Sequence, residues 1–197
     1  MNIRLMASCC LLSLSAVAAT AQMSAGTAPA PGATAAPSAA IDAQLKIIEM
    51  EMMGAVKAMP ADKFSFAPSA AIFAPSQKTE FDKVRTFAQQ ATHVAEANYF
   101  FYSHVSGLKP DVDVKGLEKL SGKDDAVAAL AGSFAFAHKA IATLTPANAF
   151  EVIDFEELGL TTRSTLASFG VAHAFDHYGQ MVEYLRMNGI VPPASAK

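Results

Sequence analysis

Residues 173–180 read His-Ala-Phe-Asp-His-Tyr-Gly-Gln, and residues 181–193 continue as Met-Val-Glu-Tyr-Leu-Arg-Met-Asn-Gly-Ile-Val-Pro-Pro. Apolar residues and histidines recur here at spacings of three and four, which is typical of a helix face turned toward its neighbours. This stripe consists of Leu166, Phe169, Gly170, His173, His177, Met181 and Tyr184. His173 and His177 are therefore expected one helical turn apart on an inward-facing surface.

Two imidazoles at this spacing can reach the same metal ion. Residues four apart on a helix project from the same side, and neutral imidazole is a common ligand of zinc and other transition metals. Two adjacent buried imidazoles cannot both be charged without a large desolvation cost, and their ring nitrogens need partners. A shared cation meets both needs, so His173 and His177 predict one edge of a metal site.

The rest of the folded part predicts three more helices and no strands, because hydrophobic residues recur at helical spacing and alternating patterns are absent. The first helix begins at Ile41 and ends before Pro60. The second opens at the capping box Thr79-Glu-Phe-Asp82 and closes at Gly107.

The third helix is capped by Ser121-Gly-Lys-Asp124 and precedes Pro146. The fourth begins after Thr161 or Thr162 and ends at Asn188-Gly189, while the short acidic segment 150–158 is predicted as one or two helical turns. Four amphipathic helices pack most simply as an all-α four-helix bundle. The long connections after the first two helices permit a crossover.

A specific metal site needs at least one more ligand, and three other histidines are available. His93 lies in the middle of the second helix, beside its apolar stripe, although a solvent-facing position is the alternative. His104 follows eleven residues later, roughly 16 Å along the axis, so these two cannot share an ion. His138 adjoins the stripe of the third helix and is either a core or rim histidine or an alternative third ligand.

Three motifs carry a family resemblance: the stretch from His173 to Pro193, the segment Pro60-Ala-Asp-Lys-Phe-Ser-Phe66-Ala-Pro68, and His93-Val-Ala. Over residues 41–193 the chain resembles the DinB-like superfamily, which is distinct from the DNA polymerase of similar name. The resemblance implies a four-helix bundle that binds a divalent metal through His93, His173 and His177, and it implies frequent homodimers. Tyr178 departs from the family pattern, because many relatives carry arginine there.

Three neutral imidazoles on one side of an ion leave positions open for water or substrate, as in catalytic sites. Zinc or nickel is the expected ion, and iron, manganese or cobalt also fit this ligand set. Characterised relatives include thiol-dependent transferases and isomerases. The predicted function is therefore a metal-dependent hydrolase or transferase acting on an unidentified small molecule. The alternatives are a non-catalytic, secreted metal-binding or interaction module and a purely structural bundle.

Two further residues are candidates for catalysis. Glu96 follows His93 by three residues, and Gln180 follows His177 by three, so both project toward the same region at helical spacing. Either could orient a ligand, and Glu96 could serve as general base. Their ordinary alternatives are a surface carboxylate and an amide that packs between helices.

The first residues have the pattern of an export signal. Arg4 precedes an apolar run over residues 5–17, and Ala19-Thr20-Ala21 forms a small-residue cleavage site. The sequence thus predicts a signal peptide over residues 1–21 and a periplasmic or secreted protein. Cys9 and Cys10 lack the pattern expected for lipidation, so a lipid anchor is disfavoured.

Composition defines the remaining organisation and the expected partners. Residues 22–40 are rich in Ala and Pro and predict a disordered linker, followed by the bundle over residues 41–193 and a tail over residues 194–197. The formal net charge is −3, and neither a basic run nor a basic-aromatic stripe occurs. Nucleic acid is therefore an unlikely class of partner. The apolar run of the signal is too short for stable membrane insertion.

Overall fold

The computed structural model describes residues 30–77 and 84–196. The chain divides into two compact units, Met1–Ala33 and Thr34–Lys197. In the described part of the first unit, the backbone amide of Ala33 donates to the carbonyl of Ala30, which closes a turn. The predicted signal peptide and residues 22–29 of the predicted linker lie outside the described residues.

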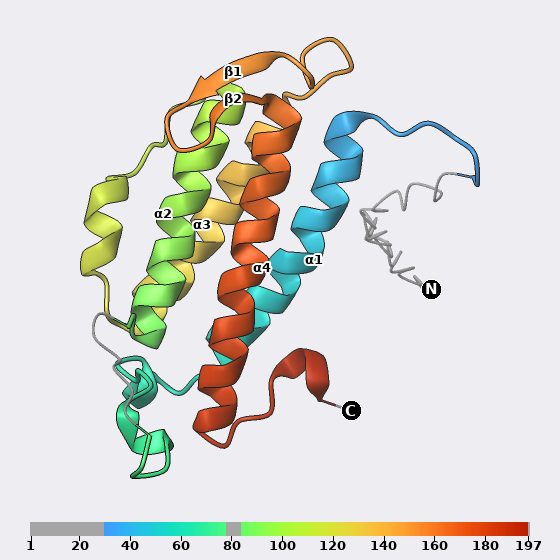
Figure 1. Cartoon of the computed structure of the whole chain (residues 1–197). Helices are drawn as coiled ribbons and strands as arrows, with labels where there is room; N and C mark the ends of the chain where they lie inside the picture. The colour runs from blue at the N-terminus through green and yellow to red at the C-terminus, as the bar shows by residue number, and fades with distance from the viewer. Residues whose placement is uncertain (1–29, 78–83, 197) are drawn as a thin grey trace, which may run out of the picture. The chain divides into compact units, whose positions relative to one another are not determined.

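The second unit is an all-α four-helix bundle, as the hydrophobic periodicity predicts (Figure 1). Its helices are α1 (Pro37–Ala58), α2 (Phe87–Ser106), α3 (Lys123–Ile141) and α4 (Arg163–Met187). Both α1 and α2 pack against α3 and α4. The consecutive helices α1 and α2 are therefore diagonal partners, and the long connection between them is the expected crossover.

Short helical turns lie within the connections and the C-terminal segment. They are the 3₁₀ helices η1 (Ala61–Lys63), η2 (Ala70–Ile72), η3 (Val114–Lys119) and η4 (Pro193–Ser195). None of the helices in the described part of the chain is both long and apolar enough to cross a bilayer.

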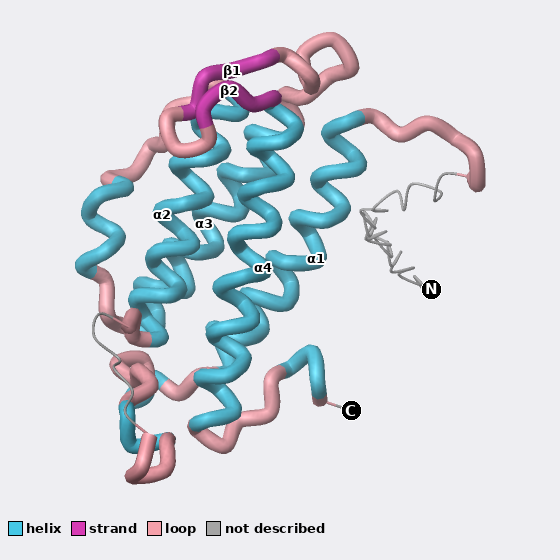
Figure 2. Tube along the Cα trace, in the orientation of Figure 1, coloured by secondary structure: helices cyan, strands magenta, loops and turns pink. Residues whose placement is uncertain are grey.

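The prediction of helical turns over residues 150–158 is wrong, because the chain forms a β-hairpin there (Figure 2). Strand β1 (Val152–Phe155) pairs antiparallel with β2 (Gly159–Thr162). Gly159 adopts a left-handed φ of 67°, which favours glycine at the turn. Neither strand alternates apolar and polar residues, since β1 reads Val-Ile-Asp-Phe and β2 reads Gly-Leu-Thr-Thr, so the sequence carries no strand signal here.

The observed helix starts also differ from the predicted ones. Helix α1 begins at Pro37 rather than at Ile41, so it includes the last four residues of the predicted linker, and proline is well suited to the first helical turn. Helix α3 begins after Gly122, without the side-chain cap expected from Ser121. The predicted start and end of α4 are confirmed, since Thr162 accepts a hydrogen bond from the amide of Thr165 and Asn188 follows the last turn.

Helix α2 begins at Phe87 rather than at the capping box predicted at Thr79, which lies outside the described residues. A second capping box is used instead: the Thr86 hydroxyl accepts from the Gln89 amide, and the Gln89 side chain accepts from the Thr86 amide. The next two amides donate to the carbonyls of Phe66 and Phe64. The connection after α1 thus satisfies the start of α2 and fixes its position.

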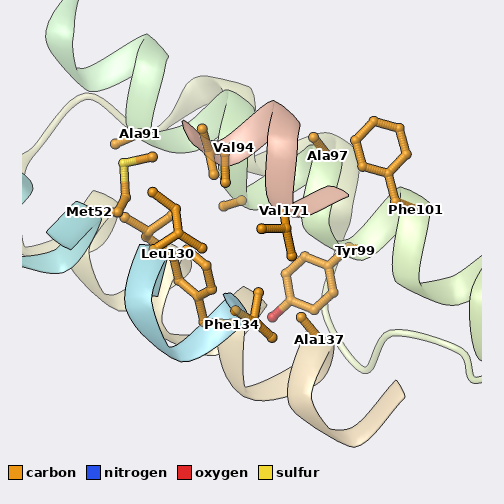
Figure 3. Packing of buried hydrophobic residues seen from close by; sticks show 14 of the residues in the cluster. Met52, Ala91, Val94, Ala97, Tyr99, Phe101, Leu130, Phe134, Ala137 and Val171 are labelled. Atoms are coloured by element: carbon orange, nitrogen blue, oxygen red, sulfur yellow. The ribbon is translucent and has the colours of Figure 1, made fainter. Parts of the chain in front are cut away.

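The core lies where the four helices meet, and Figure 3 shows its packing around Met52, Val94, Leu130 and Phe134. These side chains are fully buried. Small residues such as Ala91 let the helix backbones approach closely. At Gly170 of α4, an added Cβ would lie 2.9 Å from the Tyr102 ring of α2.

His138 is an ion-pair residue between α3 and α1. Its Nδ1 lies 2.5 Å from Asp42 Oδ1, and its Nε2 lies 2.9 Å from Glu49 Oε2. A charged imidazole can donate to both carboxylates at once. Because both ring nitrogens are engaged at the bundle surface, His138 takes the rim position and is not the third ligand of the paired histidines.

Replacing His138 with glutamine is expected to change how stability depends on pH. Burial lowers the pKa of His138, but the hydrogen bonds and charges of Glu49 and Asp42 outweigh burial and raise it. A raised pKa stabilises the fold fully below the unfolded value of 6.5, and this contribution is lost as pH rises through the folded pKa. Unfolding in urea should show the advantage of the wild type over His138→Gln shrinking as pH rises above 6.5. A difference that stays constant or grows would contradict the ion pair.

Candidate metal centre

Three histidines from two helices converge at the contact between α2 and α4. His93 comes from α2, and His173 and His177 come from α4. One ring nitrogen from each lies within 4.8 Å of the other two, and the Nε2 atoms of His173 and His177 are 3.2 Å apart. Nitrogen ligands around a tetrahedral zinc ion are separated by about 3.3 Å. Small side-chain adjustments would therefore let the three rings hold one metal ion.

His177 is held by a chain of hydrogen bonds that reaches the surface of α4. Its Nδ1 donates to Gln90 Oε1 at 2.7 Å, and Gln90 Nε2 donates to Gln180 Oε1 at 2.8 Å. Gln180 Nε2 donates in turn to Asp176 at 2.9 Å. A proton on Nδ1 leaves the lone pair of the ring on Nε2, which faces His173. An outer-sphere partner commonly fixes a metal-binding imidazole in this way.

His173 has an unmet polar requirement. Its Nδ1 is buried and has no hydrogen-bond partner among the described residues, and its Nε2 contacts the Nε2 of His177. The ring packs edge-on against Phe101, with centroids 5.3 Å apart. The two facing Nε2 atoms of His173 and His177 both have lone-pair or N–H groups in a partly buried site, and a cation between them would give each a partner. The residues present thus fit a metal ion.

His93 faces the other two rings and also contacts Arg85. Its ring centroid lies 5.2 Å from that of His173 and 4.8 Å from that of His177. Arg85 Nη2 donates to His93 Nδ1 at 3.4 Å. The predicted alternative in which His93 faces solvent is therefore not observed, since its ring is half-buried within the cluster.

The environment keeps all three imidazoles neutral, which is the form that binds metals. Burial is the largest cause and lowers the pKa of His93 and of His173 to about 4, with further contributions from neighbouring positive groups. Burial also lowers the pKa of His177. Arg85 contributes to all three shifts. Near neutral pH, the ring nitrogens would not need to lose a proton before binding an ion.

The two candidate catalytic residues occupy different positions. Glu96 lies beside His93 in the lining of two cavities, and burial followed by the charge of Glu118 raises its pKa. Gln180 is bonded to Gln90 and Asp176, so it acts on His177 through Gln90. Among the five histidines, His104 is exposed and bonds to the carbonyl of Phe100 in its own helix, as its rim position predicts.

Sequence reasoning missed Arg85 and Gln90. Gln90 precedes His93 by three residues, so it lies on the same side of α2, and it is only 2% exposed. A glutamine on an apolar helix face beside a candidate ligand is a signal that could have been used. Arg85 lies two residues before the first residue of α2. Because the predicted start of this helix was wrong, the sequence did not indicate that Arg85 lies near His93.

Replacing Gln90 with alanine is expected to weaken metal binding by about 10- to 100-fold, the usual effect of removing an outer-sphere partner. His177 would lose the acceptor that fixes its tautomer. Gln180→Ala should have a smaller effect, because Gln180 acts one hydrogen bond further out. Competition with a chelator would measure both affinities. Equal effects of the two substitutions, or no effect of Gln90→Ala, would show that this series of hydrogen bonds does not influence metal affinity.

The fold and the three histidines define a helical-bundle protein with a cluster able to hold a metal ion. The family profile of the DinB superfamily matches residues 44–181, which include His93, His173 and His177. The chain belongs to the DinB superfamily, and the predicted resemblance is confirmed. No match was found among curated proteins.

Proposed function

We propose that this protein binds a divalent metal ion through His93, His173 and His177 and acts as a metal-dependent enzyme. The observation that supports this most strongly is the convergence of three neutral ring nitrogens within 4.8 Å. Zinc or nickel is the favoured ion for an all-imidazole set, and iron, manganese or cobalt are further candidates.

When bound, the ion would supply a Lewis acid with positions open to water or substrate. The side chains around the ion would orient its ligands and would accept or donate protons. Gln90 fixes the tautomer of His177, and Arg85 places a positive charge beside His93. Glu96 has a raised pKa and lines the cavities next to His93, so it is the candidate group for accepting a proton. Hydrolysis and thiol transfer are the two reactions that suit these groups.

The proposed location is outside the cytoplasm, in the periplasm or the medium. Support comes from Arg4, the apolar run and the cleavage pattern that ends at Ala21. Export favours hydrolysis over thiol transfer, since the thiols used by relatives are chiefly cytoplasmic. The mass of the chain recovered from the exported fraction tests this, because cleavage would make Gln22 the first residue.

The proposed assembly is a homodimer. The outer surface between α1 and α4 supports this, because it exposes Ile47 and Phe175 around a shallow cavity of about 330 Å³. Apolar patches of this kind often mark protein contacts.

Cobalt substitution tests the proposed centre. We expect the purified chain to take up about one Co²⁺, and azide to change the visible spectrum because positions on the ion remain open. Uptake of cobalt without any response to azide would favour the non-catalytic metal-binding module. Failure to take up any divalent ion would overturn the metal centre itself.

A further inference from the structure

An apolar cavity of about 540 Å³ lies beside the histidine cluster. His93 and His173 form part of its lining, and the aromatic rings of Phe100, Phe101 and Phe169 form much of the remainder. This volume is within the range of small-molecule sites. The cavity therefore has the size and the position of a subsite for part of a ligand that reaches the histidines.

The phenylalanine rings of this cavity are in contact with the histidine cluster. Phe101 packs edge-on against His173 with ring centroids 5.3 Å apart, and Phe169 packs edge-on against Phe101 at the same distance. Phe101 is buried, whereas Phe169 is 36% exposed at the cavity. The exposed part of Phe169 leaves apolar surface that an apolar group in the cavity would remove from water.

The charged groups of this cavity have opposite signs. Lys115 and Glu157 contribute one charge of each sign, and Glu96 adds a carboxylate whose pKa is raised by burial. The cavity thus has no excess of positive charge that would select an anion. Recognition here would depend on shape and apolar contact.

A second cavity, of about 580 Å³, has a different chemistry. It is lined by Arg85, Gln89, Thr92 and Glu118, and it shares His93 and Glu96 with the apolar cavity. His93 is therefore the histidine of the cluster that lines both cavities. A substrate lying across this cluster would meet aromatic rings on one side and polar side chains on the other.

We infer that the substrate carries an aromatic ring, or an apolar group of similar size, next to the atom that coordinates the ion. This group occupies the cavity formed by Ala97, Phe100, Phe101 and Phe169, and the polar part of the substrate extends toward Arg85. The inference rests on the proposed metal centre and adds the substrate class.

Carboxylic acids of different size test the inference on the cobalt-loaded protein. The visible spectrum reports acetate and phenylacetate binding to the same ion, and the two probes differ in the phenyl ring. We expect phenylacetate to bind about tenfold more tightly, the gain expected from partial burial of a ring. Equal affinities would overturn the substrate class while leaving the metal centre in place. If the cobalt ion is bound but neither acid nor azide changes the spectrum, the ion has no position open to a ligand, so the proposed enzyme and the substrate class fail together while metal binding stands.

Three variants locate the subsite. Phe169→Ala should remove most of the preference for phenylacetate without changing acetate affinity. Phe175→Ala is the matched control, because Phe175 lies on the same helix and is 38% exposed but lines a different cavity. Ala97→Phe should fill the cavity and bring phenylacetate to the affinity of acetate. A preference that persists in both Phe169→Ala and Ala97→Phe, or that is lost equally in Phe175→Ala, would overturn the assignment.

Discussion

Replacing His177 with alanine is expected to reduce metal affinity by more than about 100-fold, beyond the effect of losing an outer-sphere partner. His177 contributes the ring that Gln90 orients, and its Nε2 lies 3.2 Å from that of His173. Without it, His93 and His173 remain on different helices with two nitrogens for one ion. Elemental analysis of the purified variant should find no stoichiometric metal, whereas the wild type retains about one ion per chain.

His104→Ala is the matched control for this loss. His104 also belongs to α2, but it is exposed and bonds to the carbonyl of Phe100 in its own helix. Its replacement should leave metal content unchanged. Circular dichroism should show the same helix content in both variants, which separates loss of a ligand from loss of the fold. Unchanged metal content in His177→Ala, or an equal loss in His104→Ala, would contradict the assignment of the ligands.

The bundle could be predicted because each helix repeats its apolar residues often enough to reveal the period. The spacing of Leu45, Ile48 and Met52 on α1 is a clear example, and all three side chains are fully buried. The residues at which the helices begin were harder to predict than the helices themselves. The stretch from Thr86 to Gln89 fits the Ser/Thr-x-x-Glu/Gln capping box more closely than the stretch from Thr79 to Asp82, and the carbonyls of Phe64 and Phe66 also accept from the amides at that start of α2.

The site was predictable to the extent that it depends on spacing within one helix. His173 and His177 follow from the stripe of α4, and their convergence is observed. Their meeting with His93 depends on how α2 packs against α4, which periodicity does not specify, and the family resemblance supplied that ligand. The position of Arg85 and the contacts of Gln90 with His177 and Gln180 depend on how separate segments of the chain pack together. No local pattern in the sequence encodes such contacts.

Replacing Gly170 with alanine is expected to destabilise the fold and to weaken the metal site. The new Cβ would lie 2.9 Å from both Cζ and Oη of Tyr102. Tyr102 is fully buried, and its hydroxyl donates to the carbonyl of Ala167, so the ring cannot swing into solvent. Overpacking of this kind costs about 1–3 kcal/mol, which exceeds or offsets the gain of about 1 kcal/mol from replacing glycine in a helix.

Gly179→Ala is the matched control, because it makes the same change in the same helix. Gly179 is exposed, and nothing lies within 4 Å of its added Cβ, so only the gain in helix propensity of up to about 1 kcal/mol should remain. Urea unfolding should therefore place Gly179→Ala above the wild type and Gly170→Ala below it. Gly170→Ala should also lose metal affinity, since relief of the clash must separate α4, with His173 and His177, from α2, with His93. If both variants are stabilised equally, Tyr102 does not set the spacing of these helices.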